Sequence, residues 1–121
     1  MDAVYVFLGG GFGCLIRFLI SKYTIHLIKS DFPLATFIAN IVACTVLVLV
    51  IIKFRSHIHI YNNIRLLILV GFCGGLSTFS TFSLETVELI KSGSIMLAVL
   101  NVLLSISLGF FVIYFLLNKG N

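Results

Sequence analysis

Residues 71–82 read Gly-Phe-Cys-Gly-Gly-Leu-Ser-Thr-Phe-Ser-Thr-Phe, and they lie within a run, 66–84, that contains no charged residue. Such a run can cross a bilayer, which takes roughly 20 apolar residues. Its middle nevertheless holds three glycines and four hydroxyl side chains. At membrane depth, non-helical backbone is tolerated only where it is buried in protein or lines a water-filled cavity. We therefore expect this stretch to open toward a pore or an ion site.

The whole chain has the composition of a membrane protein. Of its 121 residues, 60% are hydrophobic and 10% are charged, and the mean hydropathy is +1.22. Soluble domains carry about 25% charged residues. Four windows lack or nearly lack charge, and each can supply a spanning helix. We predict an all-α membrane protein with a single transmembrane domain over residues 1–121 and helices at about 3–20, 32–52, 66–88 and 94–117.

The positive charges are nearly balanced between the two sides of the membrane that this topology defines. If both termini share one side, that side carries Lys53, Arg55, Arg65 and Lys119, and the other carries Lys22, Lys29 and Lys91. Because Lys and Arg are enriched in cytoplasmic loops, this count favours cytoplasmic termini only slightly. We expect an oligomer in the cell membrane, either an antiparallel homodimer or a heterodimer of two gene products. The net charge of +4 is ordinary for membrane-flanking residues and gives no reason to expect a nucleic-acid partner.

The predicted first helix combines glycines with an arginine. Gly9 and Gly13 form a small-xxx-small step that lets another helix approach closely. Arg17 follows one turn later, and a guanidinium within a span costs about 2.5–3.5 kcal/mol on insertion scales. Two interpretations of Arg17 stay open. It extends to the membrane surface, or it faces an aqueous vestibule and attracts anions.

Amides and hydroxyls recur on the second and fourth predicted helices. Asn40 is the only amide in the second helix, where it either hydrogen-bonds to a neighbouring helix or donates to a dehydrated anion. Asn101, Ser105 and Gly109 repeat at a spacing of four, so they share one face of the fourth helix. Each polar residue alone favours packing. Together they indicate a polar track through several helices.

Phe79 and Phe82 are three residues apart, so they share a face wherever the chain there is helical. The edge of an aromatic ring is electropositive. Two such edges at a constriction would favour a small anion without trapping it, which conduction requires. Ordinary aromatic packing is the alternative interpretation.

The sequence contains none of the common catalytic motifs. It contains no phosphate-binding loop, no Ser/His/Asp set and no pair of catalytic carboxylates. The three cysteines fall inside predicted spans and form no Cys-x-x-Cys pair, so they read as small buried hydrophobic residues. We do not expect an enzyme.

Three motifs make the chain resemble the Fluc (CrcB-type) family of fluoride channels. They are GGGFGCLIRF at 9–18, ATFIANIVA at 35–43 and GFCGGLSTFSTFSLE at 71–85. They occur in the family's order over nearly the full length. Departures from the usual residues are Cys14, Phe18, Ala35, Ala43 and Ser77. The third motif is the most specific of the three.

The resemblance implies passive export of fluoride from the cytoplasm, which reduces fluoride toxicity. It implies an antiparallel, dual-topology dimer with two pores along the subunit interface and a third helix broken at its centre. It also implies a structural, non-transported Na⁺ held by main-chain carbonyls, which here would belong to Gly74 and Ser77. Because these ligands are main-chain oxygens, Ser in place of the usual Thr at position 77 should do little harm.

The same resemblance assigns the fluoride pathway. The family's paired phenylalanines match Phe79 and Phe82, and its pore amide matches Asn40. The other expected pore groups are the hydroxyls of Ser80, Thr81 and Ser105 and the side chain of Asn101, where many relatives have Tyr. Arg17 matches an arginine near the pore mouth.

Two rival functions remain. A small proton-coupled multidrug exporter also has four helices, but its chemistry needs a deeply buried carboxylate. Glu85 and Glu88 lie toward the end of the third predicted helix, and the first predicted helix has no acidic residue. The other rival is a non-conducting membrane assembly subunit, in which the polar residues only hold helices together.

Overall fold

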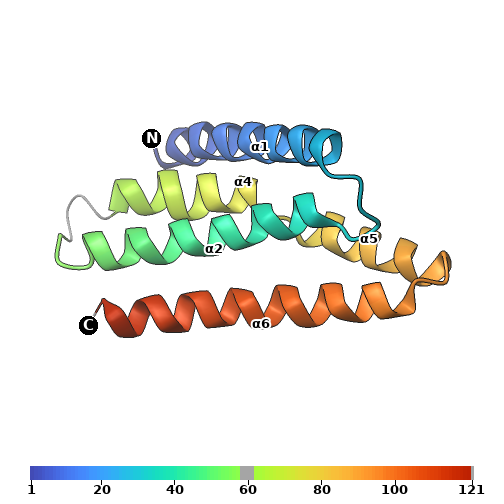
Figure 1. The fold of residues 1–121 in the computed structure, drawn as a ribbon. Coiled ribbons are helices and arrows are strands. Elements are labelled where there is room, and N and C mark those ends of the chain that lie inside the picture. Colours follow the sequence, from blue (N-terminus) through green and yellow to red (C-terminus); the bar gives the residue numbers. More distant parts are fainter. Residues whose placement is uncertain (58–61, 121) are drawn as a thin grey trace.

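The computed structural model describes residues 1–57 and 62–120, and all regular elements within these ranges are helices (Figure 1). Four helices in this part of the chain are long and apolar enough to cross a membrane. They are α1 (Asp2–Leu27), α2 (Leu34–Phe54), the interrupted span Asn62–Lys91 and α6 (Ile95–Lys119). The prediction of an all-α protein with four membrane-length helices is therefore confirmed.

The helices extend past the windows that hydropathy marked. The first ends at Leu27, whereas loss of apolar character predicts an end near residue 20. With 26 residues, α1 is about 39 Å long at 1.5 Å per residue, longer than a hydrocarbon core of about 30 Å. Backbone hydrogen bonds continue into the polar headgroup region, so a helix does not have to end where apolar residues do.

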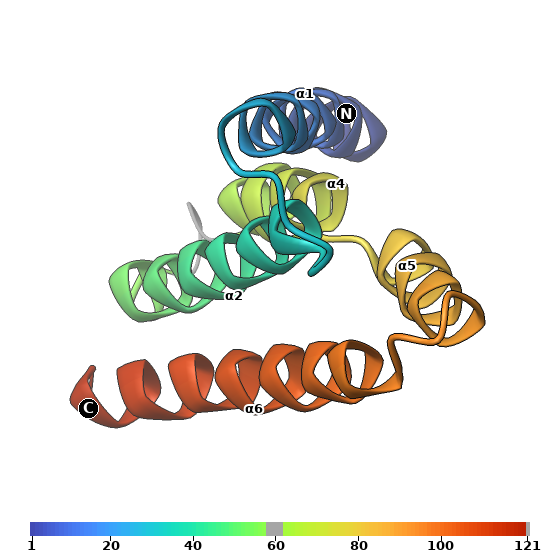
Figure 2. The same ribbon diagram turned by 45° about the vertical axis from the view of Figure 1, so that its right-hand side comes forward.

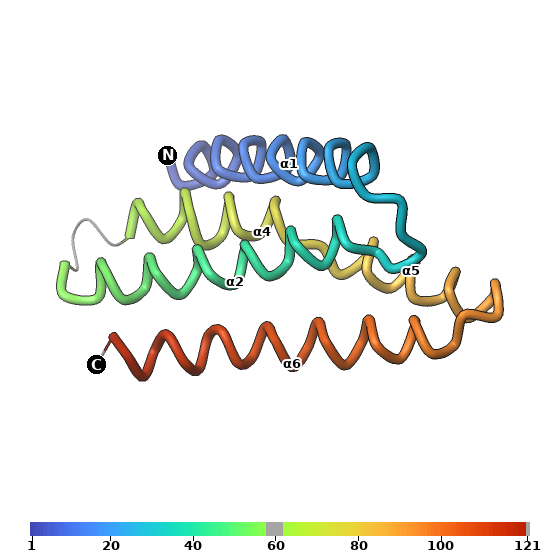
Figure 3. Tube along the Cα trace, viewed as in Figure 1, coloured from blue at the N-terminus to red at the C-terminus, as the bar shows by residue number. Residues whose placement is uncertain are grey.

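The spans run antiparallel to their sequence neighbours. One end of the bundle (Figure 3) holds the start of α1, the end of α2, the start of the third span and the end of α6. The opposite end holds the two short connections, 28–33 and 92–94. The second of these turns at Gly93, whose φ of 85° lies in the left-handed region that glycine adopts freely. This arrangement puts both termini on one side of the membrane, as the charge count assumed.

The third span consists of two parts joined by extended backbone. The first part is η1 (Arg65–Cys73), which is π-helical, followed by one α-helical turn, α4 (Gly74–Leu76). The second part is α5 (Phe79–Lys91). Ser77 has φ −76° and ψ 154°, and Thr78 has φ −150° and ψ 119°. Figure 2 shows α5 leaving the line of α4 at this link.

Glycines bring α1 into backbone contact with the third span. A Cβ added at Gly9 would overlap the carbonyl of Leu67, and one at Gly13 would overlap the carbonyl of Phe72. From the opposite side, a Cβ at Gly75 would lie 2.5 Å from the Gly10 carbonyl oxygen. Gly9 and Gly13 therefore act as the close-packing step that their spacing predicts, and the third span is their partner.

The buried core is small. Ala39, Ala43 and Leu76 form it, with Ile20 and Phe72 packed against it. Large apolar side chains cover much of the outside instead, Phe79 being 80% exposed. A bilayer or another subunit must cover such a surface, because a soluble monomer rarely exposes large contiguous apolar patches.

We predict that Gly13→Ala lowers the free energy of unfolding by about 1–3 kcal/mol, the usual cost of overpacking a tight interface. Gly11→Ala is the matched control, because a Cβ at Gly11 meets nothing within 4 Å. Thermal unfolding of both variants in detergent measures the difference. Equal stability of the two would contradict backbone contact between α1 and the third span.

Candidate functional site at the helix break

A side chain from α2 replaces the hydrogen bonds that the break in the third span removes. The Thr78 N–H donates to Asn40 Oδ1 at 2.7 Å, and Asn40 Nδ2 donates to the Thr78 carbonyl oxygen at 3.3 Å. Unpaired main-chain groups at membrane depth cost several kcal/mol each. The Asn40 amide thus substitutes for both helical partners of one residue, which lets the backbone be extended there.

The hydroxyl of Thr78 begins the second half-helix. Thr78 Oγ1 accepts from the Thr81 N–H at 3.2 Å, an N-cap interaction. The same hydroxyl donates to Thr81 Oγ1 at 3.1 Å and lies 3.4 Å from Ser80 Oγ. Thr78 is 8% exposed, whereas Ser80 is exposed. The run of hydroxyls at 78–81 is therefore a connected group at the start of α5.

The break also removes the helical donors of the last carbonyls before it. In a continuous α-helix, the N–H of Thr78 would bond to the carbonyl of Gly74, and the N–H of Thr81 to that of Ser77. Both N–H groups bond to side-chain oxygens instead, those of Asn40 and Thr78. The two carbonyls that the family resemblance assigned to Na⁺ are thus released from helical bonding, and Gly74 is exposed.

Four of the predicted pore residues line one groove of about 340 Å³ beside the break: Asn40, Phe79, Phe82 and Ser105. Thr78 and Cys44 also contribute to its wall. The rings of Phe79 and Phe82 have centroids 6.0 Å apart and planes at 38°. Helices α2, α5 and α6 therefore meet at this groove with an amide, hydroxyls and aromatic rings.

A second hollow, of about 290 Å³, lies beside the first. Arg17, Thr36, Thr81 and Glu85 line it, and Thr78 contributes to both hollows. The guanidinium of Arg17 donates to Cys14 Sγ at 3.9 Å, a long contact with a soft acceptor. The structure therefore groups Arg17 and Thr81 separately from the aromatic groove, with Thr78 shared between them.

Glu85 is a site residue whose position sequence reasoning missed. Thr36 Oγ1 donates to Glu85 Oε1 at 2.9 Å. Glu85 Oε2 is buried and has no hydrogen-bond partner among the described residues. Thr36 and Glu85 both belong to the quoted motifs, so their joint occurrence was the available signal. What was not apparent is that α2 and α5 bring them together.

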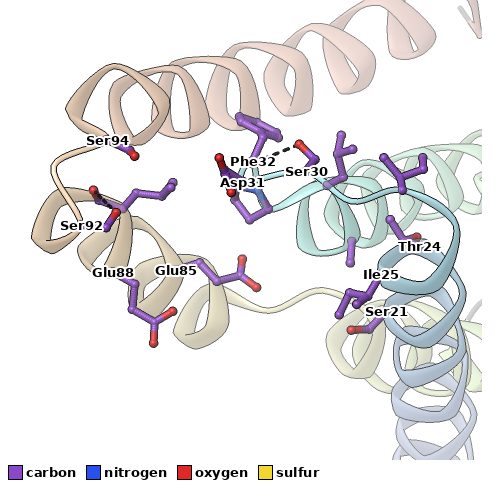
Figure 4. A pocket seen from close by; sticks show the side chains of 15 residues that line it. Ser21, Thr24, Ile25, Ser30, Asp31, Phe32, Glu85, Glu88, Ser92 and Ser94 are labelled. Atoms are coloured by element: carbon purple, nitrogen blue, oxygen red, sulfur yellow. Dashed lines mark hydrogen bonds between the residues drawn. The ribbon is translucent and has the colours of Figure 1, made fainter.

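Glu85 also faces a wider cavity of about 540 Å³ at the end of the bundle (Figure 4). Asp31, on the connection between α1 and α2, and Glu88, one turn beyond Glu85 on α5, line this cavity as well. Several serines surround them, including Ser92 and Ser94. A polar mouth therefore adjoins the hollow that holds Arg17 and Thr81.

Asn101 lies behind the aromatic groove, and it is not among the groups that line it. This side chain is 1% exposed, and its Nδ2 donates to Thr86 Oγ1 at 2.9 Å. Thr86 Oγ1 in turn donates to the Phe82 carbonyl oxygen at 2.7 Å. Ser105 Oγ donates to Asn101 Oδ1 at 3.4 Å. Asn101 thus ties α6 to the backbone that carries Phe82.

These features define a four-helix membrane protein with a polar break in one span. The model of the family described as CrcB-like protein, Camphor Resistance (CrcB), matches residues 4–117. The chain belongs to this family. The three motifs quoted above therefore lie within a family match that covers nearly the whole sequence.

Three bacterial relatives are each described as a fluoride-specific ion channel FluC. The protein from Phocaeicola vulgatus is 41% identical over 84% of this chain and 92% of its own length. Those from Shewanella putrefaciens and Serratia proteamaculans are 39% and 41% identical, over 93% and 84% of this chain and 90% and 80% of their own lengths. By these names the relatives are ion channels, which agrees with the prediction that the chain is not an enzyme.

Proposed function

We propose that this chain forms a fluoride-specific channel that lets F⁻ leave the cytoplasm passively and so reduces fluoride toxicity. The single observation that carries the proposal is the groove in which Asn40, Phe79, Phe82 and Ser105 meet. Relatives about 40% identical are named for this activity. Export down a gradient needs no energy source, and we place the channel in the cell membrane.

Fluoride is small and strongly hydrated, so a selective pathway must replace its water with close donors. An amide nitrogen carries two hydrogens, and Asn40 uses one of them for the Thr78 carbonyl, which leaves one for an anion. The electropositive edges of Phe79 and Phe82 attract an anion without a fixed charge that would hold it. The 3.4 Å bond of Ser105 to Asn101 is long and weak, so this hydroxyl can turn toward the groove.

Arg17 and Thr81 supply the approach to this pathway. A guanidinium in the hollow that they share attracts anions from the vestibule, and the Thr81 hydroxyl accepts from Thr78, which leaves its own hydrogen free to donate. Ser80, exposed at the start of α5, is a further donor. Asn101 acts through its bonds to Thr86 and Ser105, holding the two sides of the groove together.

The functional unit that we propose is an antiparallel, dual-topology dimer with pores along its interface. Phe79 is 80% exposed in the single chain, although it is a pore residue. A second subunit against this face would close the groove. The nearly even positive charge on the two sides permits insertion in both orientations. A homodimer and a heterodimer with a paralogous subunit satisfy this geometry equally.

A structural Na⁺ fits the break. Hard cations take oxygen ligands, and the carbonyls of Gly74 and Ser77 have lost their helical donors to Asn40 and Thr78. Gly74 has open space on its side-chain face. A cation at this position would offset the electrostatic cost of holding an anion at membrane depth.

The rival exporter would use Glu85 as its proton-coupled carboxylate. In this chain Glu85 is held by Thr36, and it lies beside a wide polar mouth. The rival assembly subunit would conduct nothing. Both rivals predict that the aromatic groove has no role in fluoride flux.

We predict that Phe79→Ile and Phe82→Ile each slow fluoride efflux from proteoliposomes by about tenfold or more, an added barrier of about 1.4 kcal/mol. Phe111→Ile is the control, because Phe111 stacks on Phe115 along α6 and lies outside the groove. A fluoride-selective electrode measures the rates. Wild-type rates in both groove variants would exclude the proposed pathway.

We predict that Asn40→Asp reduces efflux to the background of protein-free vesicles. A carboxylate about 4 Å from the anion's path adds about 4 kcal/mol of repulsion at an effective dielectric constant of 20. Asn40→Ala removes the bonds to Thr78 without adding charge, so it separates loss of support from repulsion. Efflux through the Asp variant that clearly exceeds the background of protein-free vesicles would refute an anion path at Asn40.

We predict that fluoride efflux requires Na⁺ during protein preparation and assay. Replacing Na⁺ with N-methylglucamine, an organic cation too large for a site between carbonyls, should lower the rate, and adding Na⁺ back should restore it. Chloride efflux measured in parallel reports selectivity. Equal fluoride rates in both salts would remove the cation from the proposal and leave the anion pathway standing.

A further inference from the structure

The end of α1 carries a cationic hollow that the fluoride pathway does not use. Lys22, His26 and Lys29 line it together with Tyr23 and Ile25, and its volume is about 630 Å³. Lys22 and His26 are four residues apart and therefore share a face of α1, and Lys29 lies just beyond the end of that helix. This surface is called the basic hollow below.

The length of α1 would place the basic hollow at the level of the lipid headgroups. The last turns of α1 extend past the length that a hydrocarbon core requires. Tyr23 is 59% exposed, as is typical of the aromatic residues at membrane–water interfaces. Ile25 and Leu27 are 67% and 76% exposed. The surface therefore combines cations with apolar groups at the depth where a phospholipid has phosphate and the start of its acyl chains.

The basic side chains of this hollow have no anionic partner in the part of the chain that the structure describes. Among residues 1–57 and 62–120, none of Lys22, His26 and Lys29 forms an ion pair. Asp31, the nearest acidic residue in the sequence, lines the cavity of Figure 4, which shares Ile25 with the basic hollow. The helix macrodipole favours cations in the last turn of α1, but Lys29 lies beyond the end of that helix.

The opposite end of the bundle shows a different use of lysine. Lys119 Nζ lies 4.9 Å from the centre of the Phe115 ring, and Lys53 Nζ lies 5.8 Å from that of Phe54. These ammonium groups rest on aromatic faces of their own helices. The lysines at one end of the molecule therefore contact aromatic rings, whereas those of the basic hollow are available to bind a ligand.

We propose that the basic hollow binds the phosphate headgroup of an anionic phospholipid. The two ammonium groups and the imidazole N–H donate to the phosphate oxygens, and Tyr23 and Ile25 contact the glycerol and upper acyl region. Basic pockets near the ends of transmembrane helices bind anionic headgroups in this way. The site is a lipid contact of the scaffold and is independent of the anion pathway.

The test uses full-length protein in detergent, titrated with phosphatidylglycerol and followed by native mass spectrometry. Each lysine near an anionic surface contributes about 1 kcal/mol, so Lys22→Gln and Lys29→Gln should each weaken lipid binding about fivefold, and the double variant about thirtyfold. The control is the double variant Lys53→Gln with Lys119→Gln, which removes the same charge at the opposite end and should retain wild-type binding.

Two further arms identify the ligand. Zwitterionic phosphatidylcholine should bind wild-type protein and the Lys22/Lys29 double variant equally, and inorganic phosphate at the same concentrations should not displace phosphatidylglycerol. The proposal is overturned if both double variants lose affinity equally, because that indicates general charge attraction. It is also overturned if inorganic phosphate competes fully, because the hollow is then a site for free phosphate.

Discussion

The structure depends on the paired hydrogen bonds between the Asn40 side chain and the main chain of Thr78. In a bilayer, a span cannot leave its helix unless something else satisfies the freed N–H and C=O groups. Asn40 reaches from α2 and satisfies both for one residue. Three features follow from this support: the extended link at Ser77 and Thr78, the new direction of α5, and the released carbonyls before the link.

The sequence left two alternative roles open for Asn40, and the structure is compatible with both at once. An amide within a span either holds helices together or meets an anion, and Asn40 has enough hydrogen-bonding groups to do both. It uses its oxygen and one hydrogen on Thr78, and it lies on the wall of the groove that Phe79 and Phe82 share. Asn40 therefore both supports the break and lines the groove, next to a buried hydrophobic cluster of only Ala39, Ala43 and Leu76 among the described residues.

Polar groups around the break form layers with distinct roles. Thr78 connects the aromatic groove to the hollow of Arg17 and Thr81, since it lines both. Behind the groove, the buried Asn101 side chain donates to Thr86 on α5 and accepts from Ser105 on its own helix, so the bond to Thr86 holds α6 against α5. Membrane helices gain little from hydrophobic attraction to one another. In this chain, hydrogen bonds of this kind hold helices together, and so does the glycine-mediated contact between α1 and the third span.

The sequence by itself determined the class of fold and the number of spans, because apolar length is a local feature. The glycines and hydroxyls of one span also indicated the stretch in which its backbone opens. The sequence also predicted a family, through motifs that are contiguous in the chain. Only the tertiary structure decided that Asn40 braces Thr78, that Glu85 meets Thr36, and that Asn101 lies behind the groove. These are contacts between different helices, and their geometry depends on how close each pair of helices approaches and on how each is rotated about its axis. No single helix encodes either quantity.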